Sequence, residues 1–203
     1  MGLVNEIDRN SENNTKNYNG FDLTFNGRFG NGATLIGGTS TGKRDLVTCD
    51  VTDPNQLRGC EIHIPFQTQL KVSGTYPMPY GFRFSGVFQS KPGPALLANY
   101  AVPSLVVAQS LGRLPSGNVT NVTVNLIEPG SMYGDRRNEL DLRVAKILRF
   151  GGTRTTVGAD IYNVLNSSAV LTYNNAFVPG GPWLQPLTVM TGRFARISAE
   201  FTF

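Results

Sequence analysis

The chain has 203 residues, of which 40% are hydrophobic and 16% charged, with a formal net charge of +4 at pH 7. No apolar stretch approaches the roughly 20 residues of a transmembrane helix, and the 18 Lys and Arg residues are too dispersed for the basic patch of a nucleic-acid-binding protein. The 23 Gly and 12 Pro favour short strands joined by turns over long helices.

Seven segments of the chain alternate apolar and polar residues with a period of two. In chain order they span residues 18–29, 31–40, 66–76, 82–90, 138–150, 154–162 and 193–203. A period of two indicates a strand with one apolar and one polar face. We expect one apolar face to collect Phe21, Leu23, Phe25, Leu70, Val72, Phe84, Leu142, Val144, Val157, Ile161, Ile197 and Phe201.

The connections between these segments alternate in length. Short turns of the type "GN", "PMPYG" and "GGT" alternate with long segments at about 41–65, 91–137 and 163–191, which we expect to be loops without regular structure. Short turns then lie on one side of the sheet and long loops on the other. Outer-membrane barrels have this asymmetry, so the predicted fold is all-β, an antiparallel meander of about seven strands that is part of a transmembrane β-barrel.

In a wide barrel the polar face of each strand lines a wet lumen. Arg196 and Glu200 lie four residues apart on this face, and they could join a ladder of charges across strands. The candidate lumen-facing residues are Asp22, Arg28, Lys71, Arg83, Asp141, Arg143, Asp160, Arg196 and Glu200.

The chain has two cysteines, Cys49 and Cys60, which lie in one polar segment. This spacing favours a local disulfide in an oxidising compartment, with free thiols as the alternative. His63 is the single histidine, so a zinc site is disfavoured, and we expect it to lie in a loop. Oxygens of Asp50, Asp53 and Asn55 could bind a hard cation, but their spacing matches no EF-hand loop. The sequence predicts no enzyme and no catalytic, cofactor or metal site.

The end of the chain resembles the last strands of TonB-dependent outer-membrane receptors. In that family a strand closes in a motif of the type D-I-x-N-L-x-N, and a loop and a final strand ending on an aromatic residue follow. The segment "YNGFDLTFNGRFGNGATLIGGTSTGK" also resembles the barrel of the large receptors that have an N-terminal carboxypeptidase-regulatory-like domain. The matching residues are Asp160, Ile161, Tyr162, Asn163, Val164, Leu165, Asn166, Gly192, Arg193 and the terminal Phe203.

The resemblance implies part of a transporter of the cell outer membrane that takes up an extracellular ligand. This chain would supply barrel wall, extracellular loops and the C-terminal strand, whose Phe201 and Phe203 the barrel-assembly machinery would recognise. Other implied partners are outer-membrane lipid, the remainder of the barrel and its plug, and TonB, which acts through the plug region. Nucleic acid is not an expected partner.

Seven strands are too few for a transporter barrel of about 22. We therefore expect a C-terminal segment, with residues 1–16 as the remnant of an extracellular loop and residues 17–203 as strands and loops. The alternatives are a small self-contained barrel, porin-like or an adhesin, and a soluble all-β binding module. The transported substrate does not follow from the sequence.

Overall fold

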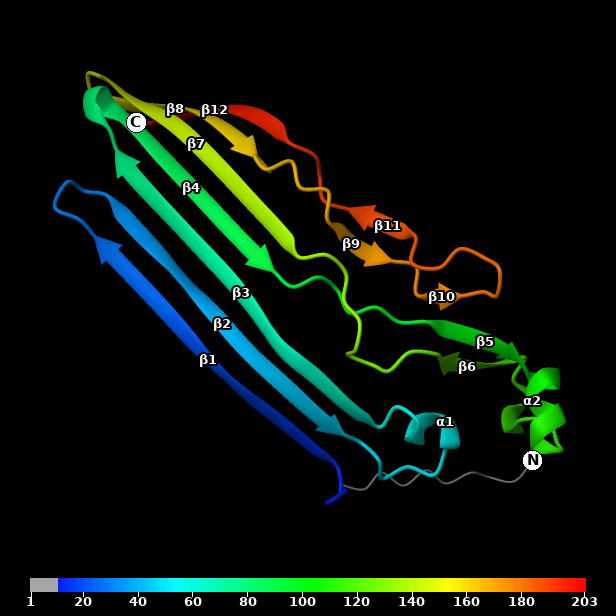
Figure 1. The fold of residues 1–203 in the computed structure, drawn as a ribbon. Helices are drawn as coiled ribbons and strands as arrows, with labels where there is room; N and C mark the ends of the chain where they lie inside the picture. Colours follow the sequence, from blue (N-terminus) through cyan, green and yellow to red (C-terminus); the bar gives the residue numbers. More distant parts are fainter. Residues whose placement is uncertain (1–10) are drawn as a thin grey trace.

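Seven long strands form one antiparallel sheet in the computed structural model, which describes residues 11–203 (Figure 1). The strands follow one another in the sheet in the same order as in the chain, so the expected antiparallel meander is confirmed. They are β1 (Thr15–Arg28), β2 (Thr34–Val47), β3 (Glu61–Pro77), β4 (Phe82–Lys91), β7 (Arg137–Phe150), β8 (Thr153–Tyr162) and β12 (Phe194–Thr202).

Short turns and long connections lie at opposite ends of the sheet, as predicted. The turns at residues 29–33, 78–81 and 151–152 lie at the upper left of Figure 1. The long connections at 48–60 and 92–136 lie at the lower right, and the one at 163–193 lies at the right. Positive φ values at the turn residues Gly32, Tyr80 and Gly151 allow the chain to reverse in so few residues.

The long connections contain regular structure, so the expectation of structureless loops is wrong. Strand β10 of the last connection pairs with β5 of the middle one, which pairs in turn with β6. Such pairing between distant segments leaves no local period, and we did not recognise these short strands in the sequence. The additional elements are α1 (Pro54–Leu57), η1 (Pro79–Gly81), β5 (Asn99–Pro103), α2 (Ser104–Leu111), η2 (Ser116–Asn118), β6 (Asn121–Asn125), β9 (Val170–Tyr173), β10 (Ala176–Phe177) and β11 (Pro186–Val189).

Strands β2 and β3 extend further toward the long connections than predicted. Between the pairs Gly42–Gln67 and Arg44–Ile64 the register shifts by one residue, because β3 has one residue more than β2 in this interval. The inserted stretch includes Pro65, which has no N–H to donate and is therefore tolerated at a bulge. The alternation of β3 is interrupted here, which is why the sequence pattern predicts its start at residue 66.

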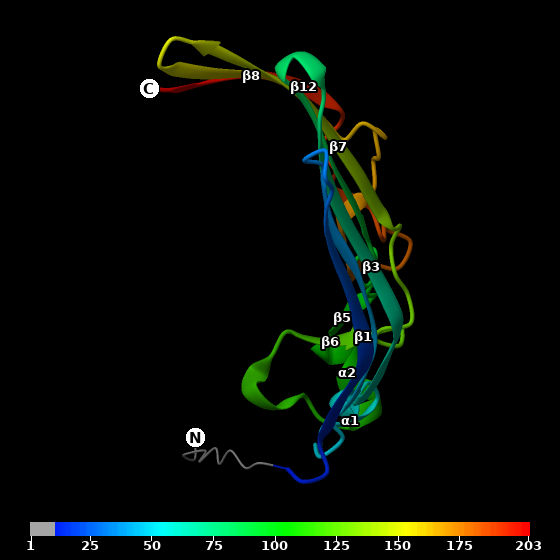
Figure 2. The same cartoon turned by 90° about the vertical axis from the view of Figure 1, so that its left-hand side faces the viewer.

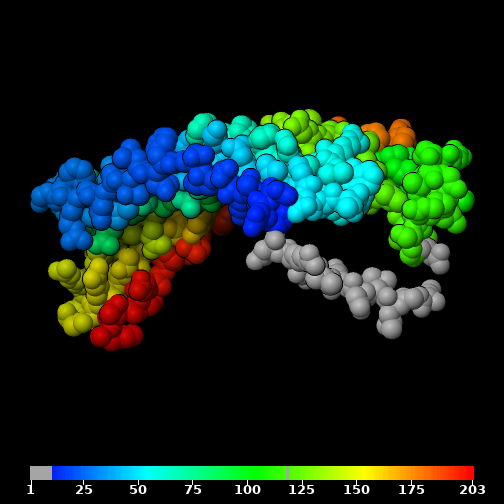
Figure 3. All heavy atoms as spheres, turned by 90° about the horizontal axis from the view of Figure 1, so that it is seen from below, coloured from blue at the N-terminus to red at the C-terminus, as the bar shows by residue number. Residues whose placement is uncertain are grey.

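The twelve apolar residues share one face of the sheet, as expected. Directly opposed residues of neighbouring strands point to the same side, and Phe84 lies opposite Val144. Leu142 likewise lies opposite Ile161. Figures 2 and 3 show the sheet bent into an arch whose hollow side faces away from the viewer of Figure 1.

The sheet has almost no core of its own. Within residues 11–203 no large side chain is fully buried, whereas Phe21, Leu23 and Ile197 are 60%, 62% and 83% exposed. The accessible surface is 14273 Å², against about 9,300 Å² for a compact monomer of this mass. Hydrophobic burial within this chain therefore does not account for the arrangement of its apolar residues.

Candidate functional site

The nine charged candidates all lie on the face opposite the apolar one. Asp22 lies opposite Ser40, which lies opposite Gln69, so these residues of β1, β2 and β3 point to the same side of the sheet. Lys71 lies opposite Gln89, which lies opposite Glu139, so these residues of β3, β4 and β7 also share one side. Alternation along each strand and the pairs that join β7, β8 and β12 place the whole set on one side: Asp22, Arg28, Lys71, Arg83, Asp141, Arg143, Asp160, Arg196 and Glu200.

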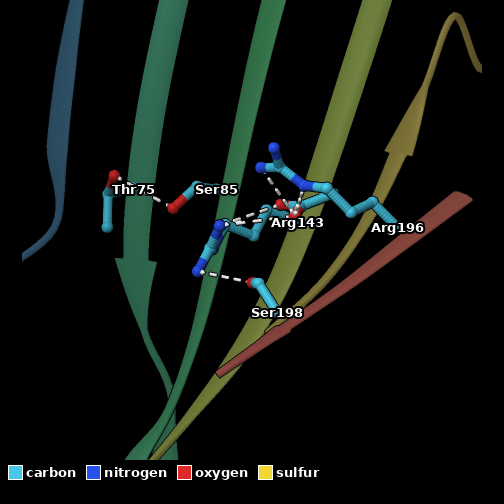
Figure 4. Close-up of polar contacts among 6 residues, drawn as sticks. Thr75, Ser85, Arg143, Arg196 and Ser198 are labelled. Atoms are coloured by element: carbon cyan, nitrogen blue, oxygen red, sulfur yellow. Dashed lines mark hydrogen bonds and ion pairs between the residues drawn. The ribbon is translucent and has the colours of Figure 1, made fainter. Parts of the chain in front are cut away.

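This polar face is the hollow side of the arch. To an observer who looks along the direction of β3, strand β4 lies on the right in Figure 1 and on the left in Figure 4. Figure 4 therefore views the side turned away from the viewer of Figure 1, and the side chains of Arg143, Arg196 and Ser198 lie there. The apolar residues consequently occupy the convex side.

Asp160 is the centre of an ion-pair cluster on this face. Its side chain is 6% exposed, and its two carboxylate oxygens lie 3.1 Å from Nη1 of Arg143 and 3.2 Å from Nη2 of Arg196. The three residues come from β7, β8 and β12 at directly opposed positions. Arg143 reaches further, to Ser198 Oγ at 3.5 Å (Figure 4). One buried carboxylate thus joins three strands through two guanidinium groups.

Small and aromatic residues shape the surroundings of this cluster. A Cβ atom at Gly158 would lie 2.7 Å from the guanidinium group of Arg143, so the glycine leaves room for Arg143 to lie across β8. On the other side, Arg196 lies 5.3 Å from the centre of the Tyr162 ring. Tyr162 in turn stacks on Phe194, with ring centres 4.7 Å apart. The guanidinium group of Arg196 is therefore held between the Asp160 carboxylate and an aromatic face.

The other charged candidates make fewer contacts. The carboxylate of Asp141 accepts a hydrogen bond from the backbone N–H of Asn163 at 2.8 Å. Asp22 and Lys71 line an open hollow of about 680 Å³ over β1 to β4. In the described part of the chain Arg28, Arg83 and Glu200 form no ion pair, so the expected ladder includes Arg196 but not Glu200.

The motif at residues 160–166 ties the end of β8 to the connection that follows it. Asn163 is 3% exposed and has φ +50°, and its side-chain amide donates to the carbonyls of Ser167 and Thr191. Its Oδ1 accepts from the N–H of Ser167. Asn166 Oδ1 accepts from the N–H of Arg193, just before β12. The two asparagines thereby hold both ends of the 163–193 connection together. The motif was recognised in the sequence, but this role of its asparagines was not.

His63 lies in β3 and not in a loop, which corrects the prediction. It lies opposite Asp45 of β2, with Nδ1 2.9 Å from Oδ1. The hydrogen bond to Asp45 raises the pKa of His63 above its ordinary value of 6.5. The same bond lowers the pKa of Asp45 below its ordinary value of 3.8. His63 is exposed and Asp45 partly exposed, at the end of the sheet that has the long connections.

A disulfide closes the first long connection. Cys49 and Cys60 are bonded, which confirms the predicted disulfide, and their Cα atoms lie 4.9 Å apart, within the roughly 4.4–6.8 Å usual for such bonds. Asp53 accepts a hydrogen bond from the N–H of Asn55 at the start of the short helix α1. The Asn55 amide donates to the carbonyl of Thr123, so this connection contacts the middle one.

Across residues 11–203 no group of three His, Cys, Asp or Glu side chains gathers closely enough to hold a metal ion. In those residues, no helix combines the length and apolar character needed to cross a bilayer. Comparison of the chain with protein-family models, curated proteins and solved structures finds no match.

Proposed function

We propose that this chain forms part of the wall of an outer-membrane transporter of the TonB-dependent type, which takes up an extracellular ligand. The observation that carries the proposal is the convex face, where apolar side chains from all seven strands are exposed together. In water such a face would be costly, since burial of apolar area is worth roughly 25 cal/mol per Å². Against lipid chains it is at no disadvantage, because lipid is as apolar as the side chains.

Three further features support this function. The hollow face is polar and has a cluster of ion pairs, as the lumen side of a wide barrel would. Aromatic residues cluster at the short-turn end, among them Tyr76, Phe82 and Phe150, where a barrel has an interfacial girdle. Lys146 lies on the apolar face near this girdle with Nζ 4.6 Å from the centre of the Phe82 ring, as a snorkelling lysine would.

In this proposal the long connections face the cell exterior and the short turns face the periplasm. The other strands of the barrel and its plug come from outside residues 11–203, and TonB acts through that plug. In this proposal the assembly machinery recognises the aromatic residues Phe201 and Phe203 at the end of β12. The residues described here contribute the wall and the ligand-facing surface, and no catalysis is proposed for them.

Two neighbouring residues with opposite orientation test the proposal. Phe84 and Ser85 are adjacent in β4, and Phe84 is on the apolar face whereas Ser85 is on the polar face. We would place a single tryptophan at each position, as Phe84→Trp and Ser85→Trp, in a chain with Trp183→Phe. In vesicles with brominated acyl chains we expect strong quenching for Phe84→Trp and little for Ser85→Trp. Equal quenching, or no association with the vesicles, would favour the soluble binding module and contradict the proposal.

A further inference from the structure

A cleft on the hollow face combines charged groups that the sheet itself does not neutralise. It has a volume of about 370 Å³ and lies where β4 ends and β7 begins, and residues of the 163–193 connection such as Leu171 and Met190 also line it. This volume is in the lower range for small-molecule sites. The cleft adjoins the Asp160 cluster, which lies further toward the short turns on the same face, and Tyr162 and Phe194 border both.

Two cations face each other in this cleft. Lys91 and Arg137 are directly opposed in the pairing of β4 with β7, and like charges at such positions destabilise a sheet. Neither forms an ion pair within 4.0 Å in the described residues. Within the described residues, the Nε atom of Arg137 is buried without a hydrogen-bond partner. An unpartnered buried donor is costly, so this arrangement is stabilised when an anion occupies the space between the two cations.

The remaining walls indicate what the anion is attached to. Gln89 and Glu139 form the neighbouring opposed pair and line the same cleft. Both side chains can accept hydrogen bonds, and an ionised glutamate can only accept, so they match a ligand with several hydroxyl groups. Phe194 also lines the cleft, is 49% exposed and has one ring face stacked on Tyr162. Its outer face can pack against the C–H groups of a sugar ring.

We propose that this cleft binds a polyhydroxylated carboxylate, an acidic sugar, with its carboxylate between Lys91 and Arg137 and its hydroxyls on Gln89 and Glu139. This inference rests on the proposed function in taking the hollow face as the surface that meets the imported ligand. It adds the chemical class of that ligand and the residues that select it.

The test uses galacturonate as the probe and galactose as its neutral counterpart. Binding to the full chain in vesicles is measured by calorimetry. We expect galacturonate to bind at least tenfold more tightly than galactose, because a hydrogen bond to a charged group contributes roughly a factor of ten or more to affinity. Arg137→Gln and Lys91→Gln should each weaken galacturonate binding about tenfold. Arg83→Gln, which removes a cation near the short turns of the same face, should leave binding unchanged.

Stability separates a ligand-binding role of the two cations from a structural one. Removing one of two opposed cations relieves repulsion, so both variants should unfold at the same or a higher urea concentration than the parent chain, followed by Trp183 fluorescence. Equal binding of galacturonate and galactose, no binding of galacturonate, or equal effects of Arg137→Gln and Arg83→Gln would overturn the inference. Quenching of Phe84→Trp by brominated lipid, measured separately, shows whether the membrane proposal stands when this one fails.

Discussion

Asp160 is the residue whose charge organises the polar face. It is nearly buried and bonded to Arg143 and Arg196, which are themselves partly exposed. Asp160→Asn removes the charge and leaves two guanidinium groups close together. We expect the free energy of unfolding in detergent to fall by about 1.5–3 kcal/mol, the range for hydrogen bonds to charged groups.

The matched control for Asp160→Asn is Glu200→Gln. Glu200 lies on the same face of β12, opposite Thr156 of β8, and forms no ion pair in the described residues. Its substitution should change the free energy by less than about 0.5 kcal/mol, as for an ordinary surface position. Urea unfolding curves of the two variants give both free energies of unfolding. Equal losses of this free energy would show that the cluster is not important for stability.

His63 gives a second prediction at the scale of single residues. Its pKa is raised by the hydrogen bond to Asp45, whose own pKa is lowered by the same bond. The pair therefore contributes its full stabilisation above pH 3.8 and below pH 6.5. The contribution is lost as the pH rises through the raised pKa of His63, or falls through the lowered pKa of Asp45. Because His63 is exposed and Asp45 partly exposed, solvent screens the interaction and the contribution is small.

An NMR titration can follow His63 without ambiguity, since it is the only histidine in the chain. We expect its pKa to lie above 6.5 in the parent chain and to fall toward 6.5 in Asp45→Asn. Lys43→Gln is the control, since Lys43 lies 3.9 Å from Asp45 but makes no hydrogen bond with His63. A pKa unaffected by Asp45→Asn would mean that the two side chains do not interact in solution.

At the scale of elements, glycines in β2 let the neighbouring strands of the sheet approach its backbone closely. A Cβ atom at Gly38 would lie 2.5 Å from the carbonyl oxygen of Leu23, which is backbone and cannot swing away. We expect Gly38→Ala to lower the free energy of unfolding by about 1–3 kcal/mol, the usual cost of overpacking. Gly152→Ala adds the same methyl group in the turn after β7, where no atom lies within 4 Å. A urea midpoint shifted equally by both substitutions would refute this explanation.

The long strands were predictable from sequence because their pattern is local. Phe21, Leu23 and Phe25 alternate with polar residues, and side-chain direction in a strand alternates with the same period. The start of β3 was missed because the bulge at Pro65 shifts the period by one residue. The strands of the long connections were missed because β5 pairs with β10 more than 70 residues away.

The polar face was predictable as a set, but its contacts were not. Alternation places Arg143, Asp160 and Arg196 on one side, and the register that aligns them across three strands is a property of the folded sheet. For the same reason the sequence did not indicate that Lys91 and Arg137 would face each other. The buried amide of Asn163 is a further example, since its partners include Thr191, 28 residues away.

The whole molecule is an open amphipathic sheet with two free edges. Among residues 11–203 no strand pairs with the outer edge of β1 or of β12, although each is the end of a seven-stranded ladder. Unpaired backbone groups are costly in lipid and invite association in buffer. Seven strands also span only about a third of the circumference of a roughly 22-stranded barrel.

We therefore expect the isolated chain, refolded in detergent, to associate through its edges and to give no compact, heat-modifiable monomer on electrophoresis.

The direction in which each backbone N–H of β1 points provides a specific test of this association. The N–H of Phe29 bonds to the carbonyl of Ala33, so odd-numbered residues of β1 face β2 and even-numbered N–H groups face the open edge. Thr24→Pro removes one edge donor without removing a bond within the sheet, and it should reduce association measured by sedimentation. Phe25→Pro removes a bond to β2 and should disrupt the sheet instead. If the parent chain forms a closed, protease-resistant monomer, its edges pair with each other, and the self-contained small barrel replaces the transporter wall as the better description.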